Sequence, residues 1–180
     1  DFATTQFDMS SLGGRQAGSS FKPFVYMAAL QKKIDPRSTF NGTSGRTIPC
    51  YGDKPVNNYA REDAGGDLSV DDALVHSVNV VFVELGCEVG ADNVVQAARN
   101  DGIGKDATST QGAVFLGGLD GRGVNALEMA SAFATFAAKG TYAEPYAIAT
   151  ITDRSGHVVY EHHARTRRVF SEDEVGVITS

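Results

Sequence analysis

Residues 14–24 read GRQAGSSFKPF and place two adjacent serines just before an apolar stretch, with a lysine shortly after them. The following residues keep apolar side chains at helical spacing as far as Lys33, and the sequence IDP then ends the pattern. Pro23 fits such a helix because it lies in the first turn, where backbone N–H groups have no intrahelical partner. The segment therefore predicts a helix over residues 19–33 with polar side chains at its N-terminus.

Ser19 and Lys22 are three residues apart, so a helix places both side chains on one face, one turn from each other. Ser20 is two residues from Lys22 and points in another direction. A serine hydroxyl becomes a good nucleophile when a base removes its proton, and a lysine is such a base if burial lowers its pKa. The helix N-terminus also favours an oxyanion. We expect Ser19 to be the nucleophile if this segment is catalytic, and an ordinary helix-capping serine is the alternative.

A second polar pair, Ser77 and Asn79, lies in the sequence HSVNVVFVEL between two predicted helices. Alternate residues of an extended turn project to the same side, so this hydroxyl and this amide could face one cleft. The hydroxyl could relay a proton to a leaving group, and the amide could hold a substrate carbonyl. Serine and asparagine are also the residues that helix starts prefer, so the pair is compatible with a simple cap.

The rest of the chain predicts more helices, one hairpin and a long irregular stretch. Gly, Asn, Asp and Pro dominate residues 38–66, and loops of this length are usually functional or packed on another element. The alanine content of the segment NALEMASAFATFAAKG suggests close helix packing in a core. The remaining expected elements are helices over residues 69–77, 79–90, 91–102 and 125–140, a hairpin within 146–162, and a helix from Ser171 with a capping box to Glu174.

The composition excludes several classes of function. The formal charge of −6 argues against nucleic acid as the main partner. The short basic cluster of Arg165, Arg167 and Arg168 is interpreted as a solvated loop or strand edge. No stretch approaches the roughly 20 apolar residues of a membrane span, and the first residues do not resemble a signal peptide.

The two cysteines, Cys50 and Cys87, fit no zinc-binding spacing, and no histidine lies in ligand register with either. The sequence therefore suggests no metal. Two unpaired, half-buried thiols are the default interpretation. A disulfide is the alternative if the protein works outside the cytoplasm.

The order S-x-x-K followed by S-x-N resembles the first two motifs of serine β-lactamases and penicillin-binding proteins. The stretch RQAGSSFKPFVYMAAL resembles the active-site helix in the transpeptidase domain of class A (bifunctional) penicillin-binding proteins. Two further stretches, PVNNYAREDAGGDLSVDDALVHSVNVVFVELGCEVG and LGGLDGRGVNALEMASAFATFAAKGTYAEPYAIATITDRSGHVVYE, resemble later parts of the same domain. The resemblance covers nearly the whole chain, with three stretches in the same order.

This resemblance implies a mixed α/β, serine β-lactamase-like transpeptidase fold, represented mainly by its helical region. Ser19 would attack the penultimate D-alanine carbonyl of a peptidoglycan stem peptide ending in D-Ala-D-Ala, and Lys22 would accept its proton. Ser77 would help return that proton to the leaving amine, while Asn79 would hold the substrate amide and help to position Lys22. β-Lactams would acylate the same serine. The family needs no metal or organic cofactor, and its members act on the extracytoplasmic face of the bacterial membrane.

The third motif of the family, K-T-G or K-S-G, does not occur in the sequence. The string AKGTY has the letters in another order, and its Gly140 is typical of a helix end. We therefore expect residues 1–180 to be a partial transpeptidase domain, with the opening strands before residue 1 and the K-T-G strand after residue 180. A membrane anchor would lie outside this segment. The chain alone would be a poor enzyme unless a companion fragment of the domain supplied the rest.

Three alternatives remain open from the sequence. A serine β-lactamase needs a glutamate that activates the deacylating water, but Glu84 and Glu88 lie on a predicted helix without a loop signature around them. Val78 also stands where that class has an aspartate. The other two alternatives are a penicillin-sensing domain that is acylated without turnover and a non-enzymatic scaffold for other cell-wall proteins.

Overall fold

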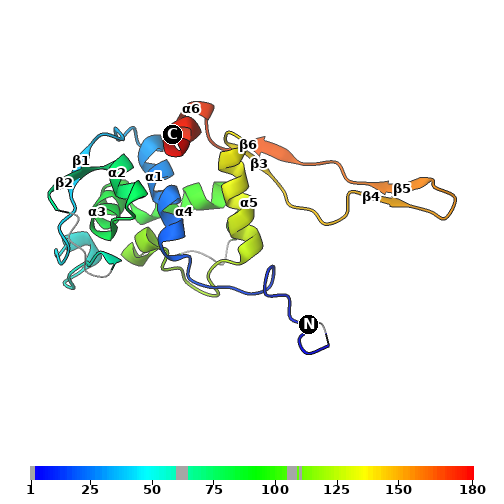
Figure 1. The fold of residues 1–180 in the computed structure, drawn as a ribbon, viewed down its shortest axis with the longest axis horizontal. Coiled ribbons are helices and arrows are strands. Elements are labelled where there is room, and N and C mark those ends of the chain that lie inside the picture. Colours follow the sequence, from blue (N-terminus) through cyan, green and yellow to red (C-terminus); the bar gives the residue numbers. More distant parts are fainter. Residues whose placement is uncertain (1–2, 60–64, 105–108, 110) are drawn as a thin grey trace.

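The computed structural model describes residues 3–59, 65–104, 109 and 111–180. Within these residues the chain forms a helical body and a two-stranded arm that projects from it (Figure 1). The helices are α1 (Lys22–Gln31), α2 (Val70–Val75), α3 (Asn79–Val89), α4 (Ala91–Asn100), α5 (Ala126–Ala137) and α6 (Glu172–Thr179), with 3-10 turns η1 (Gly18–Phe21), η2 (Pro49–Tyr51) and η4 (Gly112–Leu116). The strands are β1 (Thr39–Asn41), β2 (Asp67–Ser69), β3 (Thr141–Ala143), β4 (Thr150–Thr152), β5 (Val158–Glu161) and β6 (Thr166–Arg168), which pair antiparallel as β1–β2, β3–β6 and β4–β5.

Helix α1 is the centre of the body and contacts α2, α3, α4 and α6 (Figure 1). All its side chains from Phe24 to Leu30 are buried. The predicted helix is confirmed, but its first turn is the 3-10 turn η1, in which the Lys22 N–H donates to the Ser19 carbonyl. The reason is that Pro23 has no N–H to donate to that carbonyl, so the α-helical pattern begins only at Lys22.

Helices α2, α3 and α4 confirm the three helices predicted between residues 69 and 102. Ser69 caps α2 as expected, because its side chain accepts a hydrogen bond of 3.0 Å from the Asp72 N–H. Gly102 follows α4 with a φ of +89°, a conformation that favours glycine. Helix α3 is buried on nearly all sides. Part of the predicted irregular stretch, residues 60–64, lies outside the described residues.

Helix α5 is less buried than its alanine content predicted. It begins with a capping box between Asn125 and Glu128, yet only Ala132, Thr135 and Phe136 of the helix are buried. Two large apolar side chains of the helix stay partly exposed, Leu127 and Phe133, although the Phe133 ring contacts the ring of Phe24. The interpretation of the alanines as a sign of core packing is therefore wrong for most of this helix. Alanine also has the highest helix propensity, and this alone accounts for its presence on an exposed face.

The arm consists of the pairs β3–β6 and β4–β5, which follow one another away from α5 (Figure 1). The predicted hairpin is confirmed by the pairing of Thr150 with Glu161. The β3–β6 pair at its base was not predicted. The basic cluster lies on and beside β6, which agrees with the strand-edge interpretation, and the Arg167 guanidinium lies 4.8 Å from the centre of the Tyr142 ring. It also donates to the Asn100 carbonyl at the end of α4.

Two further features complete the body. A disulfide joins Cys50 and Cys87, with 6.0 Å between their Cα atoms, and connects η2 to α3. The default interpretation of two separate thiols is therefore wrong, because the long loop folds back onto α3. Helix α6 starts with the predicted capping box of Ser171 and Glu174. Among the helices of the described residues, none combines the length and apolar character needed to cross a membrane.

Candidate active site

Ser19 lies in η1 on the surface of the body, at the end of a segment that pairs with residues 117–124. The Ala17 N–H donates to the Gly117 carbonyl at 3.1 Å. A Cβ atom on Gly117, whose φ is +73°, would lie only 2.3 Å from the backbone oxygen of Gly18. Glycine at position 117 therefore allows the close backbone approach that fixes the turn carrying Ser19. No role was predicted from the sequence for residues 117–124.

The Lys22 side chain is 1% exposed, and four oxygen atoms lie within hydrogen-bond distance of its Nζ atom. The distances are 3.2 Å to the Ser19 hydroxyl and 2.9 Å to the Ser77 hydroxyl. The Ser77 backbone carbonyl lies at 2.6 Å and the Asn79 Oδ1 atom at 2.7 Å. The structure therefore brings together all four residues that the two sequence motifs singled out.

The chemical types of these four oxygens differ. The Ser77 carbonyl and Asn79 Oδ1 can only accept hydrogen bonds, whereas the two hydroxyls can also donate. A neutral lysine amine has two N–H groups and one lone pair. If the two N–H groups serve the two obligate acceptors, which are also the two nearest atoms, the lone pair is left for a hydroxyl proton. The geometry thus suits an amine that takes a proton from serine.

Burial lowers the pKa of Lys22 to about 8, because the charged ammonium loses the stabilisation of water. The Phe82 ring, whose centre is 5.5 Å from Nζ, forms part of the surroundings. An amine with this pKa is partly neutral near neutral pH, as a general base must be. The prediction that Lys22 acts as a base required the lysine to be buried, and the structure shows that it is.

Ser77 and Asn79 reach Lys22 from the junction of α2 and α3. Ser77 has a φ of +55°, an uncommon conformation for a residue with a side chain, and it presents both its carbonyl and its hydroxyl to Nζ. Asn79 is the first residue of α3, and its Nδ2 donates to the Asn57 carbonyl at 2.9 Å. Neither residue is the helix N-cap, which is Val78, so the capping alternative does not describe this pair.

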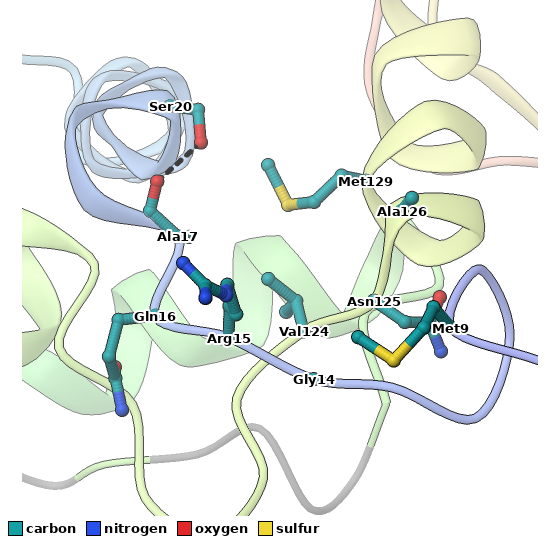
Figure 2. A pocket seen from close by; sticks show the side chains of 10 residues that line it. All are labelled: Met9, Gly14, Arg15, Gln16, Ala17, Ser20, Val124, Asn125, Ala126 and Met129. Carbon is teal, nitrogen blue, oxygen red and sulfur yellow. Dashed lines mark hydrogen bonds between the residues drawn. The ribbon is translucent and has the colours of Figure 1, made fainter. Parts of the chain in front are cut away.

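Ser20 is oriented away from Lys22. Its hydroxyl donates to the Ala17 carbonyl at 2.6 Å, and it borders a separate pocket of 310 Å³. Figure 2 shows this bond at one wall of the pocket and Met129 of α5 at the opposite wall. Ser19 is not the N-cap of α1 either, because that position is Phe21. The choice of Ser19 over Ser20 as the partner of Lys22 therefore agrees with the geometry.

The chain belongs to the penicillin-binding protein transpeptidase domain family, whose match covers residues 12–179. Among its relatives, penicillin-binding protein 1F of Bacillus subtilis (strain 168) is 38% identical over 160 residues, which are 88% of this chain and 21% of that protein. Penicillin-binding protein 1A of Aquifex aeolicus (strain VF5) is 29% identical over 98% of this chain and 24% of its own length. The chain thus spans about a fifth to a quarter of these curated relatives.

Solved structures confirm the predicted mixed α/β fold. Penicillin-binding protein 1A from Haemophilus influenzae superposes with a TM-score of 0.87 at 22% identity, over 99% of this chain and 31% of that one. The penicillin G acyl-enzyme complex of penicillin-binding protein A from M. tuberculosis gives a TM-score of 0.86 at 23% identity, over 99% of this chain and 45% of that one. The resemblance to class A penicillin-binding proteins noted in the sequence is likewise confirmed by the 1F and 1A relatives.

Proposed function

We propose that the protein containing this chain is a peptidoglycan D,D-transpeptidase, which cross-links stem peptides through a serine acyl-enzyme and is inhibited covalently by β-lactams. The observation that supports this proposal most directly is the environment of the Lys22 amine. Two obligate acceptors, the Ser77 carbonyl and Asn79 Oδ1, lie 2.6 and 2.7 Å from the nitrogen, and the Ser19 hydroxyl lies 3.2 Å from it. This is the arrangement that a serine nucleophile with a lysine base requires.

In the acylation step, Lys22 Nζ takes the Ser19 hydroxyl proton while Ser19 Oγ bonds to the carbonyl carbon of the penultimate D-alanine. The resulting tetrahedral intermediate collapses when the bond from this carbon to the terminal D-alanine nitrogen breaks. The leaving nitrogen needs a proton, and the Ser77 hydroxyl, 2.9 Å from Nζ, can pass it on from the lysine ammonium. The products are free D-alanine and an ester on Ser19.

In the second step, an amine of another stem peptide attacks the ester carbonyl and loses a proton to Lys22. The Ser19 oxygen leaves and takes that proton back, which restores the hydroxyl and the neutral amine. A β-lactam reacts through the same first step. Its leaving nitrogen stays tethered to the acyl group after the ring opens, so it can obstruct the incoming amine.

The proposal also covers the remaining part of the domain and the cellular location of the protein. A K-T-G strand from another part of the same domain would complete the oxyanion hole and align the substrate, and a membrane anchor would lie outside these 180 residues. The Cys50–Cys87 disulfide supports an extracytoplasmic location, because such bonds persist in oxidising compartments.

The experiment that tests this function uses the full-length protein. It is incubated with penicillin, and the mass of the adduct and its position are determined by mass spectrometry and peptide mapping. We expect an adduct on Ser19 that is lost in Ser19→Ala and kept in Ser20→Ala, because the Ser20 hydroxyl bonds to Ala17 instead. Release of D-alanine from a D-Ala-D-Ala peptide, with transfer to an added amine, then identifies the reaction.

The alternatives predict different results in the same assay. A β-lactamase would hydrolyse penicillin with many turnovers and leave little adduct. A penicillin-sensing domain would form the adduct but release no D-alanine from the peptide. A folded protein that forms no adduct would contradict the proposal, and the scaffold interpretation would then replace it.

A further inference from the structure

Asn58 is a buried polar residue of the long loop, with 8% of its side chain surface exposed, and neither sequence motif includes it. Its Nδ2 donates to the Gly42 carbonyl at 2.9 Å. Its Oδ1 accepts from the Val80 N–H at 3.2 Å, and its own backbone N–H donates to the Ser44 hydroxyl at 3.0 Å. The residue therefore ties three parts of the chain together: both sides of its loop and the first turn of α3.

Helix α3 depends on this external partner because its own N-terminal residues cannot cap it. The N-cap position is Val78, which has no polar side chain. The side chains on either side of it, Ser77 and Asn79, are both directed to Lys22. The first-turn N–H of Val80 is instead satisfied by Asn58, which is 22 residues earlier in the chain. Ser77 and Asn79, polar residues of the kind that usually cap a helix, are therefore available to contact Lys22.

The residue next to Asn58 makes the second connection. The backbone carbonyl of Asn57 accepts the hydrogen bond from Asn79 Nδ2 at 2.9 Å. A carbonyl can only accept, so it must face the NH₂ side of the Asn79 amide, and the oxygen side is turned to Lys22 at 2.7 Å. The orientation of this amide therefore depends on where the loop holds one carbonyl group.

We propose that Asn58 is a positioning residue for the Ser19–Lys22 chemistry: by fastening the loop to α3, it fixes the Asn57 carbonyl that orients Asn79 beside Lys22. This inference rests on the proposed function, because it assigns Asn58 a role in acylation. Asn58 itself bonds to Gly42, Ser44 and Val80, and not to Ser19. Its effect must therefore pass through Asn79.

The test is a double-mutant cycle in the full-length protein, with the rate of labelling by a fluorescent penicillin as the measurement. Asn58→Ala and Asn79→Ala are each expected to lower the acylation rate by roughly 10- to 100-fold, because small misplacements of catalytic groups have effects of this order. The double variant is expected to be no slower than Asn79→Ala alone. Multiplied effects in the double variant would overturn the inference, since they would mean that Asn58 acts independently of Asn79.

The pH profile gives a readout that loss of stability alone would not change. Asn79 Oδ1 accepts from the Lys22 ammonium, so losing this bond removes support from the charged form and lowers the lysine pKa. The midpoint at which acylation rises with pH should move to lower pH in Asn58→Ala and by a similar amount in Asn79→Ala. An unmoved midpoint in Asn58→Ala would contradict the inference.

Asn125 offers a matched control. It is also a buried asparagine at a helix start, where it caps α5, but its side chain donates to the Ser11 carbonyl and accepts from the Glu128 N–H, instead of bonding to the loop or to α3. Asn125→Ala should lower the melting temperature and leave the pH midpoint of acylation in place. If Asn58→Ala folds poorly, the similarly sized Asn58→Leu, which loses the side-chain bonds to Gly42 and Val80 and adds no charge, is used in the same cycle with the same criterion.

The two proposals fail in different ways. If the wild-type protein forms no adduct on Ser19, the proposed function is wrong and the inference falls with it. If the wild type is acylated and Ser19→Ala is not, but Asn58→Ala behaves like Asn125→Ala, only the role of Asn58 is wrong.

Discussion

The helical body and the arm are stabilised in different ways. In the body, α1 and α3 are buried on nearly all sides, and the polar groups around Lys22 are supported by segments far apart in the sequence. In the arm, every residue of β4 and β5 is exposed, and the strands are held by pairing with each other. The chemistry of Lys22 therefore depends on the packing of the body, so the effect of a substitution should increase with the burial of the residue in the body.

The largest effect is expected for Lys22→Ala. Removal of the base should lower the rate of acylation by fluorescent penicillin by about 1,000-fold in the full-length protein, since general bases contribute rate factors of this order. Lys32→Ala, at the exposed end of α1, is the matched control and should label at the wild-type rate. A Lys22→Ala protein that keeps more than a tenth of the wild-type rate would show that another group accepts the serine proton.

The next effect concerns the disulfide that fastens the loop to α3. Replacing both cysteines by alanine should lower the free energy of unfolding by about 2–4 kcal/mol, measured by urea denaturation, because the unfolded chain is then less constrained. A reducing agent should destabilise the wild type and leave the double variant unchanged. Equal stability of the oxidised wild type and the double variant would argue against a structural role for the bond.

Asp101 is expected to make stability depend on pH. It is completely buried at the end of α4, close to the Thr135 hydroxyl. Burial raises its pKa to about 8, against the opposing effects of the Thr135 hydroxyl and, more weakly, of the Arg167 charge. Between about pH 4 and 8 the folded state therefore binds more protons than the unfolded state, and stability falls as the pH rises through this window.

The variant Asp101→Asn tests this dependence. The wild type should lose about 1–3 kcal/mol more than the variant between pH 5 and pH 7.5, in urea denaturation at both values. This range stays below pH 8, because the lowered pKa of Lys22 adds stability with rising pH only between about 8 and 10.5. Parallel curves for the two proteins would mean that Asp101 is charged in the folded state.

The smallest effect should come from the arm. Val159 of β5 is 63% exposed, and Val159→Ala should change the free energy of unfolding by less than about 0.5 kcal/mol. The same substitution in the body, Val81→Ala on α3, removes a fully buried side chain and should cost about 2 kcal/mol. Similar costs at both positions would show that another surface covers the arm in solution.

Local signals were sufficient for much of the fold and for the pairing of Ser19 with Lys22. Capping residues such as Ser69 and Ser171 act within three residues of their partners, so the sequence displays them directly. The i, i+3 spacing of Ser19 and Lys22 likewise follows from helix geometry. The meeting of these two with Ser77 and Asn79 was available only through the family resemblance.

Long-range contacts account for what the sequence did not indicate. Asn58 belongs to an irregular stretch without periodicity, and its proposed role depends on a hydrogen bond with Val80, which lies in another element. The pairing of Arg15 with Val124, which supports the turn of Ser19, has no local signature either. The predicted core packing of α5 was wrong because alanine is equally compatible with a packed core and with an exposed helix surface.

The turn at the end of the arm has a practical consequence for following this protein in cells. The turn at residues 154–156 is exposed and is held by local bonds to Asp153. Such loop tips tolerate inserted sequence well. A fluorescent domain placed between Ser155 and Gly156 would sit at the far end of the hairpin from the helices, where it can report the location of the protein while the surroundings of Lys22 stay intact (Figure 1).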